Sequence, residues 1–162
     1  MHCPSCGTLM NIQDKNLLLC PNCKHEEHNN PRPTNGAIIK NEKGEILLTK
    51  RKFDPKKGYW DIAGGFVNVQ ETIEESLRRE IKEELGVDII SSSYLTSQFS
   101  RYLYKGENLH TLMFAFIVEI PIEKIKAGDD VSEVRFFAPD KIPYEEMAFE
   151  GITQILKEYL KK

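Results

Sequence analysis

The chain has 162 residues, of which 40% are hydrophobic and 29% are charged, and its formal net charge is −3. This composition is typical of a soluble protein with one ordinary domain and a small addition. No apolar run approaches the roughly 20 residues that cross a bilayer, and the net charge excludes a general attraction for nucleic acid. The first residues lack the basic and apolar regions of a signal peptide, so we expect a cytoplasmic protein without a membrane partner.

All four cysteines lie in the first 23 residues, in two Cys-x-x-Cys pairs. Cys3 and Cys6 form the first pair, Cys20 and Cys23 form the second, and 13 residues separate the pairs. Two such pairs are typical of a tetrahedral zinc site, in which a hairpin brings the pairs together. We therefore predict a structural Zn²⁺ bound by the four thiolates, because four sulfur ligands leave no open position for a substrate.

Other interpretations of the cysteines are two disulfides, which a cytosolic context disfavours, and a redox-active pair, which lacks its usual βαβ setting. A segment of about 28 residues cannot bury a useful core, so we expect the metal to fold a zinc ribbon at residues 1–28. The charges of the first 35 residues sum to three minus three, or zero, and do not support nucleic-acid binding; they are Lys15, Lys24, Arg32, Asp14, Glu26 and Glu27.

Residues 29–35 contain Pro31 and Pro33, neither of which can continue a helix or a central strand. We expect this segment to be an extended linker to one α/β domain at residues 36–162. The alternation and apolar runs predict strands at residues 37–39, 46–49, 59–63, 94–104, 112–120 and 133–137, and helices at 72–85 and 144–160. Thr72 and Glu75 form a capping box at the start of the first helix, and Gly86 favours a left-handed cap at its end.

The helix predicted at residues 72–85 carries acids at the edge of its apolar face. That face recurs every four residues and consists of Ile73, Leu77, Ile81 and Leu85. Glu80, Glu83 and Glu84 fall within an arc of about 100° that borders this face. Like charges four residues apart repel, and a carboxylate at the edge of a core is costly unless something compensates it. A hard cation such as Mg²⁺ would compensate these charges, and a solvated acidic face is the alternative that the helix alone leaves open.

The residues around this helix resemble the Nudix box, G-x₅-E-x₇-R-E-U-x-E-E-x-G-U, where U is aliphatic. Every fixed position matches, from Gly65 through Glu71 to the run Arg79-Glu80-Ile81-Lys82-Glu83-Glu84-Leu85-Gly86-Val87. The resemblance covers 23 residues and extends to the strand that leads into Gly64. It implies a Nudix α/β/α sandwich with a mixed sheet, and Mg²⁺- or Mn²⁺-dependent hydrolysis of a nucleoside diphosphate linked to another group.

The resemblance also implies roles for individual residues. The implied ligands of the divalent metal are Glu80, Glu83, Glu84 and the backbone carbonyl of Gly64. Arg79 is expected to orient these acids, most simply by pairing with Glu71, and Glu83 or Glu84 is a candidate general base. Many family members take a further acid from a later loop, for which Asp130 and Glu133 are the candidates and Asp129 is a weaker one.

The order of ribbon, linker and Nudix domain resembles that of NAD(H) pyrophosphatases. Their downstream motif begins Ser-Gln and contains proline and tryptophan, whereas the segment Ser97-Gln98-Phe99-Ser100 has neither. ADP-ribose, NAD(H), nucleotide sugars, dinucleoside polyphosphates and simple nucleotides therefore all stay open as small-molecule substrates, and a homodimer is compatible with the sequence. The candidate substrate contacts are Arg51 to a phosphate and Trp60, Phe99 and Tyr102 to a base, with an exposed loop cation and ordinary packing as the alternatives.

Two other functions compete with hydrolysis. An inactive Nudix-fold module that binds nucleotides or regulates would be expected to lose acids of the box, and this sequence keeps them all. An isomerase of isoprenoid diphosphates on the same fold would need a catalytic cysteine in the main domain, and no cysteine follows Cys23.

Overall fold

A computed structural model describes residues 1–104, 106–128 and 130–161, and for residues 102–104 and 107 it describes the backbone alone. The chain divides into two units, Met1–Pro31 and Arg32–Lys162. In the part of the chain that the structure describes, no helix is long and apolar enough to cross a bilayer.

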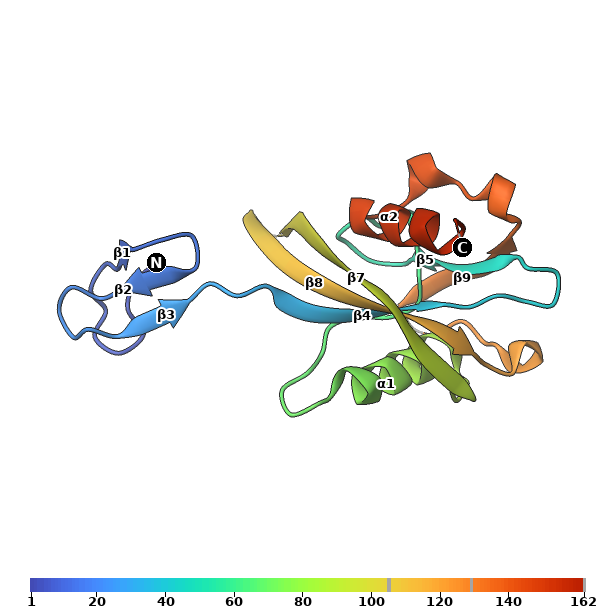
Figure 1. The fold of residues 1–162 in the computed structure, drawn as a ribbon, viewed down its shortest axis with the longest axis horizontal. Coiled ribbons are helices and arrows are strands. Elements are labelled where there is room, and N and C mark those ends of the chain that lie inside the picture. Colours follow the sequence, from blue (N-terminus) through green and yellow to red (C-terminus); the bar gives the residue numbers. More distant parts are fainter. Residues whose placement is uncertain (105, 129, 162) are drawn as a thin grey trace. The chain divides into compact units, whose positions relative to one another are not determined.

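The first unit is a small antiparallel sheet with very little apolar core. Its strands, in spatial order, are β1 (Asn11–Ile12), β2 (Leu17–Leu19) and β3 (Glu26–His28) (Figure 1). The buried residues of its core are Cys3, Met10 and Cys20, with Leu18 packed against them. Two of these three residues are cysteines, so apolar packing contributes little to the fold of this unit.

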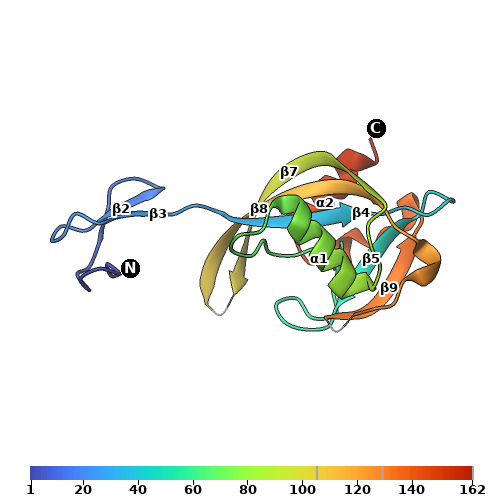
Figure 2. The same ribbon diagram turned by 90° about the horizontal axis from the view of Figure 1, so that it is seen from below.

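The second unit contains two three-stranded sheets between two helices (Figure 1). One sheet has the order β4 (Arg32–Ile38), β8 (Glu107–Glu119), β7 (Ser91–Tyr104), and the other has the order β6 (Trp60–Asp61), β5 (Ile46–Arg51), β9 (Val131–Phe137). Strands β4 and β8 are parallel and the other pairs are antiparallel. The helices α1 (Ile73–Leu85) and α2 (Glu150–Tyr159) lie on opposite sides of the sheets (Figure 2). The predicted α/β/α sandwich with a mixed sheet is confirmed.

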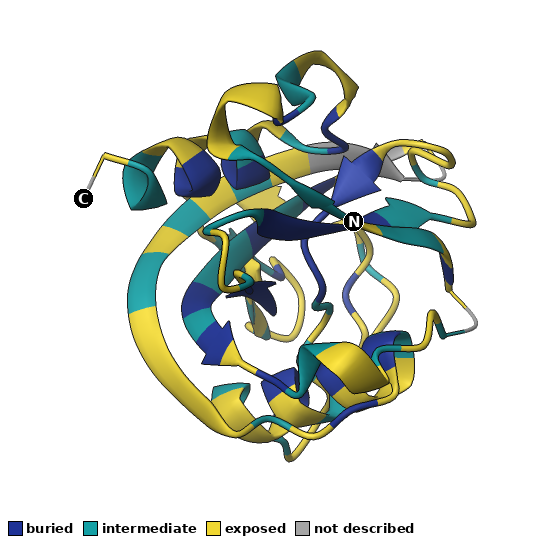
Figure 3. Cartoon of the chain, turned by 90° about the vertical axis from the view of Figure 1, so that its right-hand side faces the viewer, coloured by how far each residue is buried: buried dark blue, intermediate teal, exposed yellow. Residues whose placement is uncertain are grey.

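Each helix covers its own hydrophobic cluster. Under α1, Leu77, Ile81 and Leu85 pack with Leu47 and Phe116. Under α2, the buried partners are Ile152, Ile155, Leu156, Ile38 and Trp60. Buried residues lie on the inward faces of both helices, and exposed residues lie on their outer faces (Figure 3).

Both ends of α1 are built as the sequence predicts. The Thr72 hydroxyl accepts the N–H of Glu75, and the Glu75 carboxylate accepts the N–H of Thr72, which completes the capping box. Gly86 closes the helix in the left-handed conformation, with φ 72° and ψ 10°. Because these signals are local, they fix the helix before any tertiary contact is considered.

The start of β4 differs from the predicted linker at residues 29–35. β4 begins at Arg32 and includes Pro33. The carbonyl of Pro33 accepts the N–H of Val67, and the neighbouring Asn35 N–H donates to Gly65 O, so the backbone groups at these positions face residues 63–67. The missing N–H of Pro33 therefore costs no bond in the ladder between β4 and β8, and the strand tolerates it.

The C-terminal helix begins at residue 150, six residues later than predicted. The residues before it form a short 3₁₀ turn at Tyr144–Glu146 and then an extended segment. Met147 pairs with Trp60, and the N–H of Ala148 donates to Trp60 O at 2.8 Å. Pairing with β6 holds this segment extended and overrides its helical pattern. The two other 3₁₀ turns are Ile122–Lys124 and Pro139–Lys141.

Candidate functional site

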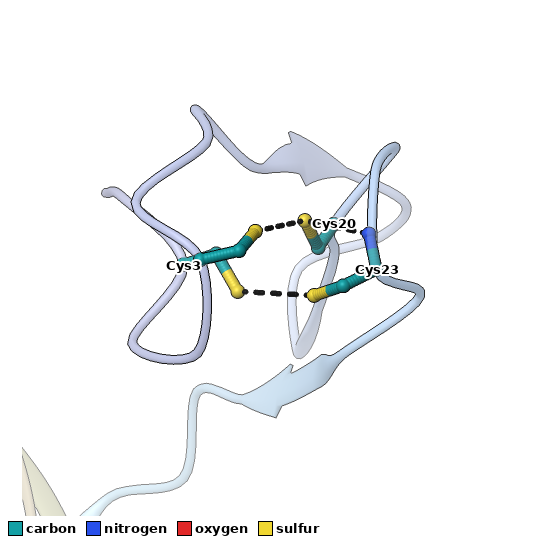
Figure 4. A group of neighbouring side chains, drawn as sticks. Cys3, Cys20 and Cys23 are labelled. Atoms are coloured by element: carbon teal, nitrogen blue, oxygen red, sulfur yellow. Dashed lines mark hydrogen bonds between the residues drawn. The ribbon is translucent and has the colours of Figure 1, made fainter.

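The four cysteine sulfurs of the first unit face one another and lie within 4.8 Å of one another (Figure 4). The Sγ atoms of Cys3 and Cys23 are 3.5 Å apart, as are those of Cys6 and Cys20, and all four thiols are free. A disulfide would need about 2.05 Å. Sulfurs bound at about 2.3 Å around a tetrahedral zinc lie about 3.8 Å apart, so this arrangement fits such an ion.

In the second unit, α1 carries a half-buried carboxylate at Glu84. One of its oxygens accepts the N–H of Gly64 at 3.0 Å. Burial raises the pKa of Glu84 to about 8; the Gly64 hydrogen bond opposes this, and the charges of Asp61 and Glu80 add to it. Burial also raises the pKa of Glu80, against the lowering effect of Arg79. This raised pKa favours the protonated form of Glu84 without a cation, and a bound cation would displace that proton.

Arg79 connects the acids of the helix to the loop before it. Its Nε donates to Glu71 at 2.7 Å, and its Nη1 donates to Glu80 at 2.7 Å and to Glu83 at 3.0 Å. Its Nη2 donates to the carbonyl of Phe66 at 3.0 Å. Phe66 belongs to the loop that runs from the glycine pair to Glu71. Bonding to Arg79 holds the pKa of Glu71 at about 2, so this pair stays charged at all physiological pH values. Arg79 thus fixes the positions of three carboxylates at once.

The glycine pair allows the loop and the helix to approach closely. A Cβ atom on Gly65 would lie 2.4 Å from Oε1 of Glu80. Gly64 has φ +144°, and a Cβ atom there would lie 2.4 Å from the carbonyl oxygen of Asn35. Only glycine fits at position 64, whereas a side chain at position 65 would displace the Glu80 carboxylate, so the two glycines let the backbone of the loop lie directly against the acids.

Acids from four separate segments line one pocket of about 370 Å³. Glu80 and Glu84 come from α1, Asp54 from the loop between β5 and β6, Asp61 from β6, and Asp130 from the turn before β9. Arg51, at the end of β5, also lines the pocket. A cavity that holds several carboxylates and one guanidinium can bind a cation together with an anionic ligand.

Asp61 lines the pocket although no sequence motif identifies it. It is 9% exposed, and its carboxylate accepts the N–H of Ile62 at 2.8 Å and bonds Nη1 of Arg51 at 3.0 Å. Burial raises the pKa of Asp61 to about 6, and Arg51 opposes this shift. One sequence signal could have identified it: Asp61 is an acid inside the apolar strand that leads into Gly64. A charge buried in such a strand needs a partner, which indicates a site.

Only some of the other predicted site residues line the pocket. Asp130 lines the pocket, whereas Glu133 does not and instead bonds to Lys50 and Arg135. Glu83 is exposed, bonds to Arg79 and is not among the residues that line the pocket. Asp129 and the side chain of Tyr102 lie outside the described residues.

The two other predicted aromatic contacts need correction. Trp60 is 3% exposed and packs in the core under α2, with its ring 4.9 Å from that of Phe137. Phe99 is half-exposed, its ring lies 5.6 Å from that of His110, and it does not line the pocket. Neither ring is available to a base in the pocket. Their neighbours Asp61 and Gln98 line it, because successive residues of a strand face opposite sides.

The chain resembles known proteins in both sequence and fold. Residues 30–159 match the NUDIX domain family. The chain is 38% identical over 126 residues to the ADP-ribose pyrophosphatase of Methanocaldococcus jannaschii, covering 78% of the chain and 70% of that protein. It is 29% identical over 143 residues to the NAD-capped RNA hydrolase NudC of Pseudomonas aeruginosa, covering 87% of the chain but only 49% of that protein. The crystal structure of a NUDIX hydrolase from Nitrosomonas europaea superposes with a TM-score of 0.69 at 25% identity, covering 99% of the chain and 90% of that structure.

Proposed function

The chain belongs to the NUDIX family and is a Nudix hydrolase, and from this premise we propose that it cleaves ADP-ribose or a closely related nucleoside diphosphate derivative. The pocket carries the proposal, because it brings Glu80, Glu84 and Asp130 together beside Arg51. With ADP-ribose, water adds to one phosphorus, the P–O–P bridge breaks, and AMP and ribose 5-phosphate leave.

The residues of the pocket fit a divalent metal. Glu84 is a half-buried carboxylate whose pKa is raised to about 8, and Glu80 is a second carboxylate close to it. We propose that these two acids and the carbonyl of Gly64 hold Mg²⁺ or Mn²⁺, with Glu83 at the outer edge. An ion bound there would neutralise phosphate charge and lower the pKa of a bound water. The ligands offered are all oxygen, which is the donor type that these hard cations prefer.

Asp130 is our candidate for the general base. Glu84 is occupied by the Gly64 N–H, and Glu83 bonds to Arg79 outside the pocket. Asp130 is exposed at the pocket wall, where its carboxylate can take a proton from the attacking water. No ion pair of Asp130 is found among the described residues, so its carboxylate is available for this task.

Arg51 is our candidate for the contact with a substrate phosphate. Its Nε donates to Pro55 O at 2.8 Å, its Nη1 donates to Asp61 at 3.0 Å, and its guanidinium lies 5.3 Å from the ring centre of Phe149. These three contacts hold the guanidinium still in the pocket wall. A guanidinium that is already oriented loses little entropy when it binds a phosphate, which favours both affinity and placement.

The Methanocaldococcus relative supports ADP-ribose as the substrate, because 70% of its length aligns with this chain. The relatives called NAD-capped RNA hydrolase NudC support NAD-capped RNA less strongly, because the chain spans about half their length. The Ser97-Gln98-Phe99-Ser100 segment also lacks the proline and tryptophan that follow Ser-Gln in NAD(H) pyrophosphatases. We therefore place ADP-ribose first.

A panel of substrates tests the proposed preference for ADP-ribose. ADP-ribose, NADH, an NAD-capped RNA and a nucleoside triphosphate are each assayed with Mg²⁺ and with Mn²⁺, and the products are identified by mass. We expect AMP and ribose 5-phosphate from ADP-ribose at the highest kcat/KM. A preference for the nucleoside triphosphate with release of pyrophosphate would contradict the proposal.

We also propose that the first unit is a zinc ribbon, followed by a linker and the hydrolase domain. The support is the close set of four free sulfurs and the near absence of an apolar core. The four thiolates would complete a tetrahedral shell, so this zinc would stabilise the fold and take no part in hydrolysis.

A further inference from the structure

We propose that Gly128 is a positioning residue for hydrolysis: it lets the backbone before β9 lie directly on the end of α1, and so sets Asp130 against the pocket. This inference rests on the role proposed above for Asp130. It adds a residue outside the Nudix box that acts through its backbone and touches neither substrate nor metal.

Two backbone hydrogen bonds join this segment to the last turn of α1. The N–H of Gly128 donates to the carbonyl of Glu84 at 2.8 Å, and the N–H of Lys126 donates to the carbonyl of Leu85 at 2.9 Å. Carbonyls in the last turn of a helix have no partner within the helix. We call these two bonds the clamp. The clamp binds the backbone of Glu84, whose side chain faces the pocket, so the acid helix and the segment that carries Asp130 are directly joined.

The clamp requires glycine at position 128 because the two backbones nearly touch. A Cβ atom on Gly128 would lie 1.9 Å from the carbonyl oxygen of Glu83, 2.9 Å from its carbonyl carbon and 3.0 Å from Cα of Glu84. All three atoms belong to the backbone of α1, so no side chain can rotate away. The clash is much closer than a van der Waals contact, and relieving it would move the two backbones apart by roughly 1 Å or more.

The other side of the turn is held by β5. The carbonyl of Asp130 accepts the N–H of Lys52 at 3.1 Å, and the Ser132 hydroxyl donates to Lys50 O at 3.1 Å. The carbonyl of Gly128 accepts the N–H of Val131 at 3.2 Å, which closes the turn on itself. Asp130 thus lies between two anchors, α1 on one side and β5 on the other. We expect a shift at Gly128 to reach Asp130, because the bond from the Val131 N–H to the Gly128 carbonyl ties the two flanks of Asp130 together.

A glycine that only permits tight packing would give a different result from a glycine that positions a catalytic acid. A packing glycine affects stability, and any loss of turnover follows from unfolding. A positioning glycine changes kcat in the folded protein, and its effect disappears when the acid is absent. The kinetic cost of misplacing a reacting group by about 1 Å can reach 10²-fold.

The experiment is a double-mutant cycle of Gly128→Ala and Asp130→Asn, with kcat and KM for ADP-ribose and Mg²⁺ and with thermal stability for each protein. We expect Gly128→Ala to lower kcat by about 10- to 10²-fold while KM changes by less than about threefold. In the Asp130→Asn background, the same change should lower kcat by less than about threefold. Gly44→Ala is the matched control, because Gly44 has φ +77° and no atom lies within 4 Å of its added Cβ. It should lower stability through strain and leave kcat unchanged.

Lys126→Pro provides a second route if Gly128→Ala is too unstable to assay. It removes the N–H that donates to Leu85, and the preceding Ile125, with φ −58° and ψ 133°, already has the conformation that favours a following proline. The same loss of kcat is expected, again only when Asp130 is present. Multiplicative effects of the two changes, or a normal kcat in a folded Gly128→Ala protein, would overturn the inference. A normal kcat for Asp130→Asn would overturn it together with the assignment of the base, whereas failure of the wild type to cleave ADP-ribose would refute the proposed substrate alone.

Discussion

The two candidate metal sites of this chain are built in opposite ways. In the first unit, four sulfurs already lie within 4.8 Å of one another, and two of the three buried core residues, Cys3 and Cys20, belong to this group. In the second unit, the acids come from separate segments, and among the described residues no three of them form a group as close as the cysteines. One site is complete with protein ligands alone, and the other leaves room for water and substrate.

On our proposal, this difference gives each metal a different role. A closed site stabilises the chain that forms it, and its metal exchanges slowly. An open site must tolerate unfavourable electrostatics until the cation arrives, as Glu84 does with its pKa raised to about 8. The large apolar clusters under α1 and α2 stabilise the second unit enough to offset the cost of a buried carboxylate. The first unit has no apolar cluster of comparable size among its described residues.

Removing one thiolate should break the first unit outright. We expect Cys20→Ser to lose the zinc and to unfold residues 1–31, because Cys20 is fully buried and the remaining core is too small to fold alone. Zinc content by elemental analysis and the amide spectrum of the first unit by NMR measure this effect. His25→Ala, a change near the cluster but outside it, should retain about one zinc per chain. A folded, zinc-free Cys20→Ser protein would show that the metal is dispensable.

Removing the charge of Glu84 should break the open site without unfolding the second unit. We expect Glu84→Gln to lower turnover by at least about 10²-fold, the scale of a lost metal ligand. Mg²⁺ should raise the melting temperature of the wild type and leave that of Glu84→Gln unchanged. Glu74→Gln, an exposed acid in the first turn of the same helix, serves as the control and should behave as wild type. Normal turnover by Glu84→Gln would mean that Glu84 is an ordinary acid of the helix.

The raised pKa of Glu84 predicts a smaller effect of pH on stability. Its folded-state pKa is about 8 and its usual value is 4.5, so between these values the folded protein keeps a proton that the unfolded chain has released. The free energy of unfolding without Mg²⁺ should therefore fall as pH rises from about 5 to 8. In Glu84→Gln this contribution is absent, and we expect the two profiles to diverge by about 1 kcal/mol or more. Denaturant melts at several pH values measure it, and parallel profiles would contradict the assigned burial of Glu84.

Local patterns in the sequence predicted much of this architecture. The capping box of Thr72 and Glu75 and the left-handed Gly86 are set by residues within one turn of each other, and both were found where expected. The four cysteines were grouped correctly because their spacing alone brings them together. The apolar stripe of α1 also placed Glu84 at the edge of the core, where its pKa is raised.

Features that depend on distant partners could not be predicted in this way. Trp60 looked like a base contact, but it packs under α2, and no local pattern shows which strand face that helix covers. Asp61 and Asp130 come to one pocket only because β6 and β9 flank the same strand, β5. Gly128 is required by the backbone of α1, some 40 residues earlier in the chain, rather than by its own φ.

The central claim is that one chain holds two metals of different kinds, and selective chelation tests it most directly. Protein purified without chelator is treated briefly with EDTA, and hydrolysis of ADP-ribose and zinc content are followed in the same samples. We predict that activity is lost first, returns fully with Mg²⁺, and does so while about one zinc per chain stays bound. Activity that falls in step with zinc, and that returns only when Zn²⁺ is added, would contradict the division between a closed structural site and an open catalytic one.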